Sequence, residues 1–193
     1  SLAVLVAATA SVAAATTGPL RILYLGREGT PAAQHCHVLM RDLGRDAIWF
    51  DFESPSDAAP VGDRLSQYDL VVSDGVDISG NKPLSIPVLK PEFPAKDKED
   101  DAKFVAKTKA DILAALTKER RTDYETFLKQ RDPEKREKRD TVANYEKRPE
   151  PLTFQFPMSV KGSMERTQVP ADCELKLFAA EPDIAKPIAF AWD

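Results

Sequence analysis

Apolar residues near the start of the chain fall into short runs separated by one amphipathic segment. The run at 20–25 is almost entirely apolar, which is typical of a strand buried on both faces of a sheet. Positions 31–43 then carry apolar residues at spacings of three and four, and this predicts a helix with Thr30 as its N-cap. Two further runs, 47–52 and 69–73, predict the next strands. The order strand, helix, strand, strand predicts an α/β fold with a parallel sheet.

Five residues follow the first and third predicted strands and form a candidate ligand pocket. They are Gly26, Arg27, Glu28, Asp74 and Gly75. Open α/β sheets bind ligands at the carboxyl ends of their strands, which is where these residues fall. The turn after the first strand lacks the glycine fingerprint of a dinucleotide site. The pocket is therefore predicted without a catalytic residue or a cofactor.

His35, Cys36 and His37 form the cluster that most resembles reactive chemistry. A nucleophilic cysteine needs a neighbouring base and an exposed position. Cys36 falls in the middle of the predicted helix, where adjacent residues point to different sides. We therefore expect a buried structural thiol flanked by two surface histidines. A metal site is not expected, because no second cluster completes a ligand set.

The segments RILYLG, AIWFDFE and QYDLVVSDG, with the helix between the first two, resemble the opening of a ThuA-like domain. This family is a flavodoxin-like relative of the class I glutamine amidotransferases. The resemblance covers residues 20–77 and implies a partial flavodoxin-like sheet. The prolines at 78–100 predict a loop in place of the elements that would complete the domain, so the α/β unit is expected to be truncated.

Residues 101–148 are densely charged, with both signs interleaved, and this predicts a helical linker. Phe104 and Ile112 lie on one amphipathic helix, and Tyr124 lies on a second. We expect these helices to cover the sheet face that the first helix leaves open. A third helix, with almost no apolar residues, is expected after Asp132. Acidic residues among its lysines and arginines, and the net charge of -4, argue against nucleic-acid binding.

The last segment, 149–193, is expected to hold a further linker and the first strands of a β-hairpin. Cys173, Leu175 and Leu177 alternate with charged residues as in a half-buried strand, and 188–192 is its expected neighbour. A hairpin without further strands is marginal in water. We therefore expect the chain from 161 onward to stay separate from the α/β layer.

The same segment carries a second resemblance, through the dipeptide VP, the stretch LFAAEPDI and the terminal WD. These residues resemble the junction in PVC-type secreted dehydrogenases, where a ThuA-like domain is joined to a β-propeller like that of the glucose/sorbosone dehydrogenases. The resemblance implies an N-terminal fragment that stops inside the first propeller blade.

Residues 1–15 are apolar and end in small side chains, which predicts a signal peptide whose basic n-region is missing. A buried alanine-rich helix is the alternative. A signal peptide implies export to the periplasm or the extracellular space, with membrane association of the parent protein left open. Disulfides form in such compartments, so pairing of Cys36 with Cys173 also stays open.

Together the two resemblances imply the non-catalytic N-terminal region of an exported dehydrogenase that oxidises sugars or alcohols. The α/β unit then serves as an accessory binding or docking module, with a carbohydrate as a candidate ligand. Its partners are the propeller and cytochrome regions of the parent polypeptide. Haem c and a quinone or calcium ion belong to those regions, and no cofactor is expected in this chain. The alternative is an enzyme domain related to ThuA-like amidotransferases and hydrolases.

Overall fold

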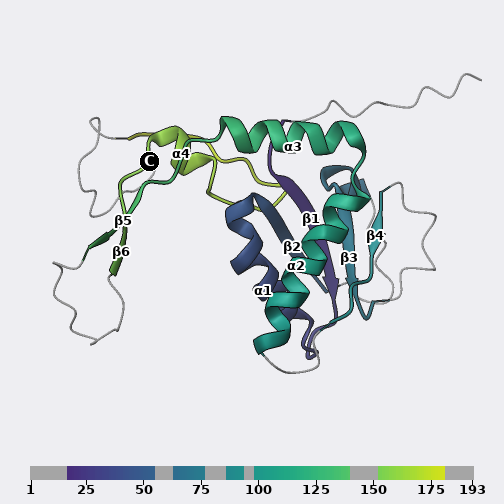
Figure 1. Cartoon of the computed structure of the whole chain (residues 1–193). Helices are drawn as coiled ribbons and strands as arrows, with labels where there is room; N and C mark the ends of the chain where they lie inside the picture. Colours follow the sequence, from purple (N-terminus) through teal and green to yellow (C-terminus); the bar gives the residue numbers. More distant parts are fainter. Residues whose placement is uncertain (1–16, 55–62, 77–85, 94–97, 140–151, 181–193) are drawn as a thin grey trace, which may run out of the picture.

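The computed structural model describes residues 17–54, 63–76, 86–93, 98–139 and 152–180 (Figure 1). The expected signal peptide at 1–15 and the second hairpin strand at 188–192 lie outside the described residues.

Four parallel strands form the central sheet, in the order β2-β1-β3-β4. Their bounds are β1 (Leu20–Gly26), β2 (Ile48–Glu53), β3 (Leu70–Asp74) and β4 (Val88–Leu89). The predicted α/β class and the first three strands are confirmed, each strand to within one residue. The strand order is consistent with a partial flavodoxin-like fold.

The fourth strand corrects the expectation of a loop throughout 78–100. Val88 and Leu89 pair with β3, and the backbone N–H of Val71 donates to the carbonyl of Pro87 at 2.9 Å. Proline is tolerated at a sheet edge, where its missing N–H is not needed by a further strand. The prolines therefore confine β4 to two residues instead of excluding it.

Helix α1 (Ala32–Leu43) follows β1 after a short turn, close to the predicted bounds. Pro31, and not Thr30, occupies the N-cap position, while the Thr30 hydroxyl accepts a hydrogen bond from the Ala32 N–H at 3.3 Å. A 3-10 turn, η1 (Gly44–Asp46), and a left-handed Ala47 with φ of 56° then lead into β2.

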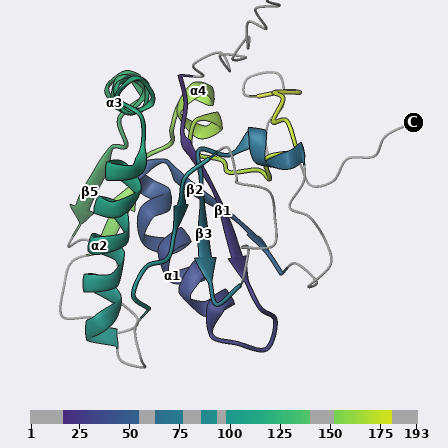
Figure 2. The ribbon, with the colours of Figure 1, turned by 90° about the vertical axis from the view of Figure 1, so that its right-hand side faces the viewer.

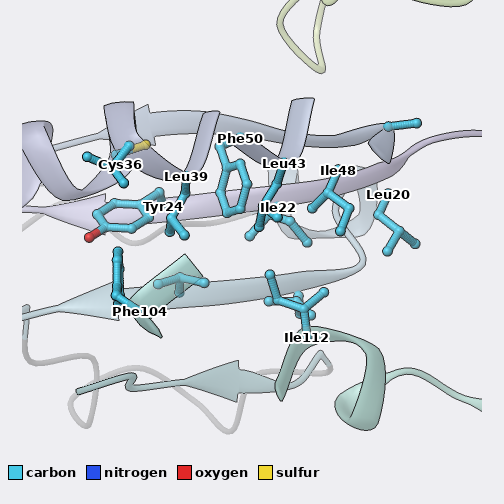
Figure 3. Packing of buried hydrophobic residues seen from close by; sticks show 14 of the residues in the cluster. Leu20, Ile22, Tyr24, Cys36, Leu39, Leu43, Ile48, Phe50, Phe104 and Ile112 are labelled. Carbon is cyan, nitrogen blue, oxygen red and sulfur yellow. The ribbon is translucent and has the colours of Figure 1, made fainter. Parts of the chain in front are cut away.

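Helices α2 (Lys98–Ala115) and α3 (Lys118–Gln130) pack on the same face of the sheet as α1 (Figure 2). The expectation that they cover the opposite face is wrong. Phe104 and Ile112 of α2 join Ile22 and Tyr24 in one buried cluster that also holds α1 side chains (Figure 3). The apolar stripe of α2 fits beside α1 because one helix cannot cover four strands.

The opposite face of the sheet is covered without a long helix among the described residues. Leu23, Leu25 and Val71 pack there against Leu65 and Tyr68, around the 3-10 turn η2 (Asp63–Gln67). The C-terminal segment 166–171, here called the strap, completes this layer by placing Ala171 against it.

The strap is tied to the sheet by three hydrogen bonds from residues far apart in the sequence. Gln168 donates to the carbonyl of Phe50 at 2.9 Å, and the Ala171 N–H donates to Asp51 Oδ2 at 2.8 Å. Arg21 Nη1 donates to the carbonyl of Val169 at 3.2 Å. The expectation that the C-terminal segment stays separate is therefore wrong for the strap. The backbone of the strap covers a sheet face that would otherwise be exposed to solvent.

Between α3 and the strap lie a two-stranded ribbon and a short helix. The ribbon pairs β5 (Arg136–Arg139) with β6 (Leu152–Gln155) in antiparallel fashion, and α4 (Val160–Met164) follows. The expected third helix is wrong at 136–139, where the sequence offers no apolar stripe to bury on a neighbour. Beyond the strap, 173–180 contains no strand, and Phe178 is 83% exposed, so the expected strand at Cys173 to Leu177 is not formed.

Candidate functional site

The carboxyl ends of β1 and β3 lie next to each other in the middle of the sheet. Gly26 and Asp74 are register partners on these two strands. From β1 the chain crosses to β2 on one side, and from β2 it crosses to β3 on the other, so this is the topological switch point. Ligands of open α/β sheets bind at such points.

Asp74 is the centre of a polar cluster at this edge. Its Oδ2 accepts a hydrogen bond from the Tyr24 hydroxyl at 2.8 Å and lies 2.8 Å from Nδ1 of His35. In the neutral tautomer whose Nδ1 donates to Asp74, Nε2 of His35 presents a lone pair. No described residue bonds Nε2 or Asp74 Oδ1. Both side chains are 15% exposed, so the pair is held in place yet reachable from solvent.

Aromatic rings surround the imidazole of His35. It stacks on Phe93 with ring centroids 5.1 Å apart and planes 13° apart, and Phe104 tilts toward it at 6.0 Å. On the other side of the cluster, Tyr24 stacks with Phe52 at 6.0 Å. Figure 3 shows Tyr24, Cys36 and Phe104 gathered at one end of the core. The site thus combines a carboxylate, an imidazole and apolar ring surface.

Burial keeps the protons on two groups next to this cluster. The pKa of the Tyr24 hydroxyl is raised, first by burial and then by its hydrogen bond to Asp74 and the charge of that carboxylate. Burial, with the charges of Asp51 and Asp74, raises the pKa of the Cys36 thiol to about 12. Cys36 is 1% exposed and is a free thiol, as expected of a structural cysteine.

The two histidines beside Cys36 differ from each other. His37 is exposed, as expected, whereas His35 is half-buried against Phe93 and bonded to Asp74. The expectation that both are surface residues is wrong for His35. The first turn of α1 brings it over the carboxyl end of β3, a contact that spacing within the helix does not reveal.

The five predicted pocket residues separate into two groups. Gly26, Asp74 and Gly75 lie together at the switch point, with Gly75 in a left-handed conformation at φ of 69°. Arg27 and Glu28 lie on the exposed turn before α1, where their backbone groups bond to Thr30 and Ser54. Arg27 and Glu28 therefore shape the turn through their backbone groups, and neither places its side chain next to Asp74.

Gly26 is required by close packing. A Cβ atom at this position would lie 2.5 Å from Cβ of Ala32 and 2.8 Å from the ring of Phe52. The absence of a side chain therefore lets α1 start directly above the end of β1, and this places His35 at Asp74.

Tyr24, His35 and Phe93 are the site residues that sequence reasoning missed. The alternation along β1 places Tyr24 on the helix-covered face, and its position two residues before Gly26 is the one available signal. Phe93 follows the unexpected strand β4, so no pattern pointed to it.

Metal-binding clusters and membrane-spanning helices are both absent from the described part of the chain. No group of three or more His, Cys, Asp or Glu side chains gathers there in a way that could hold a metal ion. None of the helices described is both long enough and apolar enough to cross a bilayer.

The chain was also compared with known proteins. No family model, no curated protein and no solved structure matches it. A function for this chain is therefore inferred from the geometry of the site and from the residues that carry the two resemblances.

Proposed function

We propose that the α/β unit is a non-catalytic binding module that takes a polyhydroxylated ligand, such as a carbohydrate, at the carboxyl edge of its sheet. The observation that carries this proposal is the shared bonding of Tyr24 and His35 to one oxygen of Asp74. Asp74 Oδ1 remains as an acceptor and His35 Nε2 as a second polar atom, while Phe93 offers an apolar ring beside them. Convergent polar groups next to aromatic surface are the usual composition of a small-ligand site.

Among the described residues near this edge, three side chains that could act as nucleophiles are buried or hydrogen-bonded. Cys36 is buried and its pKa is raised to about 12, so the thiolate that attack requires does not form near neutral pH. The hydroxyl of Ser73 donates to the carbonyl of Val76 at 2.8 Å, and that of Ser54 accepts from the Glu28 N–H at 3.0 Å. These contacts support binding over covalent catalysis.

The module belongs, in this proposal, to the N-terminal region of an exported sugar- or alcohol-oxidising dehydrogenase of the PVC type. The ThuA-like opening and the VP, LFAAEPDI and WD residues are the support for it. The strap ends five residues before LFAAEPDI and is bonded to β1 and β2, so it would hold the start of a following β-propeller near the module. Reading the full gene tests this part, since a propeller and a C-x-x-C-H haem motif downstream are expected.

A second candidate is a ThuA-like hydrolase or amidotransferase, and one observation favours it. An imidazole oriented by a carboxylate on Nδ1, with Nε2 free, is the arrangement of a general base. Such a base could activate water without a protein nucleophile. The two candidates therefore share His35 and differ in what happens to the ligand.

Calorimetric titration of the full chain with glucose and with sorbitol tests the binding proposal. We expect saturable binding that His35→Gln abolishes and that His37→Gln, the exposed neighbour on the same helix, leaves unchanged. In parallel, release of ammonia from glutamine and hydrolysis of p-nitrophenyl acetate should be no faster with the protein than in buffer alone. Turnover that His35→Gln removes while His37→Gln retains it would replace the first candidate by the second.

A further inference from the structure

A cavity of about 970 Å³ opens at the amino edge of the sheet, away from Asp74. One wall is the start of the sheet, with Arg21 and Trp49. The facing wall is α3, with Asp123 and Phe127, and Met164 of α4 closes one side. A volume of this size is typical of small-molecule sites. Its walls carry charges of opposite sign that the described residues do not neutralise.

Arg21 is the unpaired cation on the sheet wall. It is the register partner of Trp49, and its Cζ atom lies 5.5 Å from the centre of the indole ring. Its guanidinium makes one hydrogen bond, from Nη1 to the carbonyl of Val169, and no ion pair with any described carboxylate. Asp69 also lines the cavity and accepts a hydrogen bond from the Arg21 backbone N–H, but both of its carboxylate oxygens are already bonded to Arg120. The guanidinium of Arg21 therefore lies over an indole ring and has most of its donors available.

Asp123 is the unpaired anion on the α3 wall. Its Oδ2 is buried and has no hydrogen-bond donor among the described residues, and no described cation forms an ion pair with it. Glu119, one turn earlier on α3, also lines the cavity and is exposed. Glu165 lines it as well but is paired with Lys161. Asp123 thus contributes to the helical wall a carboxylate that no described cation neutralises.

We propose that this cavity binds a small zwitterion of the amino-carboxylate class. The ligand carboxylate bonds the guanidinium of Arg21, where the planar fork matches its two oxygens. The ligand ammonium neutralises Asp123, and the aliphatic part of the ligand packs on Phe127 and Met164. A simple anion is disfavoured by Asp123 and Glu119, and a simple cation by Arg21. This site shares no residue with the Asp74 cluster and is independent of the function proposed for it.

Three six-carbon probes test the inference: 6-aminohexanoate, hexanoate and hexylamine. Binding is followed by Trp49 fluorescence in the full chain carrying Trp192→Phe, which leaves Trp49 as the sole indole. We expect saturation by 6-aminohexanoate below about 10 mM and at least about tenfold weaker binding of the other two, since each lacks one charged contact. Equal binding of all three probes, or no binding of 6-aminohexanoate, overturns the proposal.

Substitutions locate the site. Arg21→Gln and Asp123→Asn should each weaken the binding of 6-aminohexanoate by about tenfold or more, because each substitution removes one charge-assisted contact. Arg41→Gln and Asp42→Asn, which alter an exposed pair on α1, should change the affinity by less than about twofold, as exposed pairs contribute little. His35→Gln should leave it unchanged, which separates this site from the Asp74 cluster. If Arg21→Gln fails to fold, amide shifts in the unsubstituted protein decide: changes centred on 117–123 support the site, and changes centred on Gly75 contradict it.

Discussion

Arg120 on α3 forms a two-point ion pair with Asp69, the residue directly before β3. Nε lies 2.6 Å from Oδ1 and Nη2 lies 3.1 Å from Oδ2, and Nη2 also donates to the carbonyl of Pro19 at 2.7 Å. The two side chains are 15% and 17% exposed. This contact joins α3 to the amino ends of β1 and β3 and so closes the core at that edge.

Replacing Arg120 by glutamine should lower the free energy of unfolding by about 2–4 kcal/mol, because it leaves the Asp69 carboxylate largely buried without its counter-charge. Urea unfolding followed by circular dichroism measures the change. Arg41→Gln, which breaks an exposed pair with Asp42, is the matched control and should cost less than about 1 kcal/mol. Equal losses for the two variants would show that the Arg120 pair does not anchor α3.

Gly26→Ala should destabilise the protein by about 1–3 kcal/mol, since the new methyl group meets Ala32 and Phe52 in a packed core. Gly44→Ala is the control. Its Cβ would meet nothing within 4 Å, and Gly44 has a helical φ of -58°, so a change of under about 1 kcal/mol is expected. The difference between the two urea midpoints is the readout, and a Gly26→Ala midpoint at or above that of Gly44→Ala contradicts the packing described for the start of α1.

The two thiols should differ in reactivity. Cys173 is exposed and should react with Ellman's reagent at pH 8 within minutes, whereas Cys36 is buried with a raised pKa and should react only when the chain is unfolded. One thiol per chain is therefore expected in buffer and two in urea. Cys173→Ala should leave no fast-reacting thiol, and a fast thiol in that variant would mean that Cys36 is accessible.

Stability should fall at alkaline pH because the folded state raises the pKa of Cys36. The thiol titrates near pH 9 when unfolded and near 12 when folded, so its contribution is complete below about pH 9 and is lost between 9 and 12. The raised pKa of Tyr24 adds a second loss above about pH 10. Between its unfolded and folded pKa values, each group lowers the free energy of unfolding by about 1.4 kcal/mol per pH unit. In a plot of the free energy of unfolding against pH, Cys36→Ala should reduce the decline that begins near pH 9, and Cys173→Ala should not.

Strands that are buried on both faces are the part of this fold that the sequence predicts best. The runs at β1, β2 and β3 are apolar because helices and the strap cover both sides of the sheet. The periodicity of α2 predicts a helix with one apolar stripe but carries no information on which sheet face receives it. The two-residue strand β4 is too short to leave a pattern, and its pairing with β3 is a tertiary contact.

The residues of the candidate site likewise include some that the sequence predicts and some that it does not. Gly26 and Asp74 were predicted because the topology of an open sheet fixes where its carboxyl edge lies. Tyr24 and His35 were missed because their bonds to Asp74 span 50 and 39 residues. The strap was missed for the same reason, since Gln168 reaches Phe50 across 118 residues.

Backbone and imidazole NMR shifts during a glucose titration of the full chain test the central claim, that the Asp74 cluster binds a polyhydroxylated ligand. The account predicts saturable changes at Tyr24, His35, Asp74 and Gly75, with the Nε2 resonance of His35 among the largest, and their loss in Asp74→Asn. Changes that do not saturate, or that centre on the strap or the amino edge while His35 stays unmoved, would contradict it.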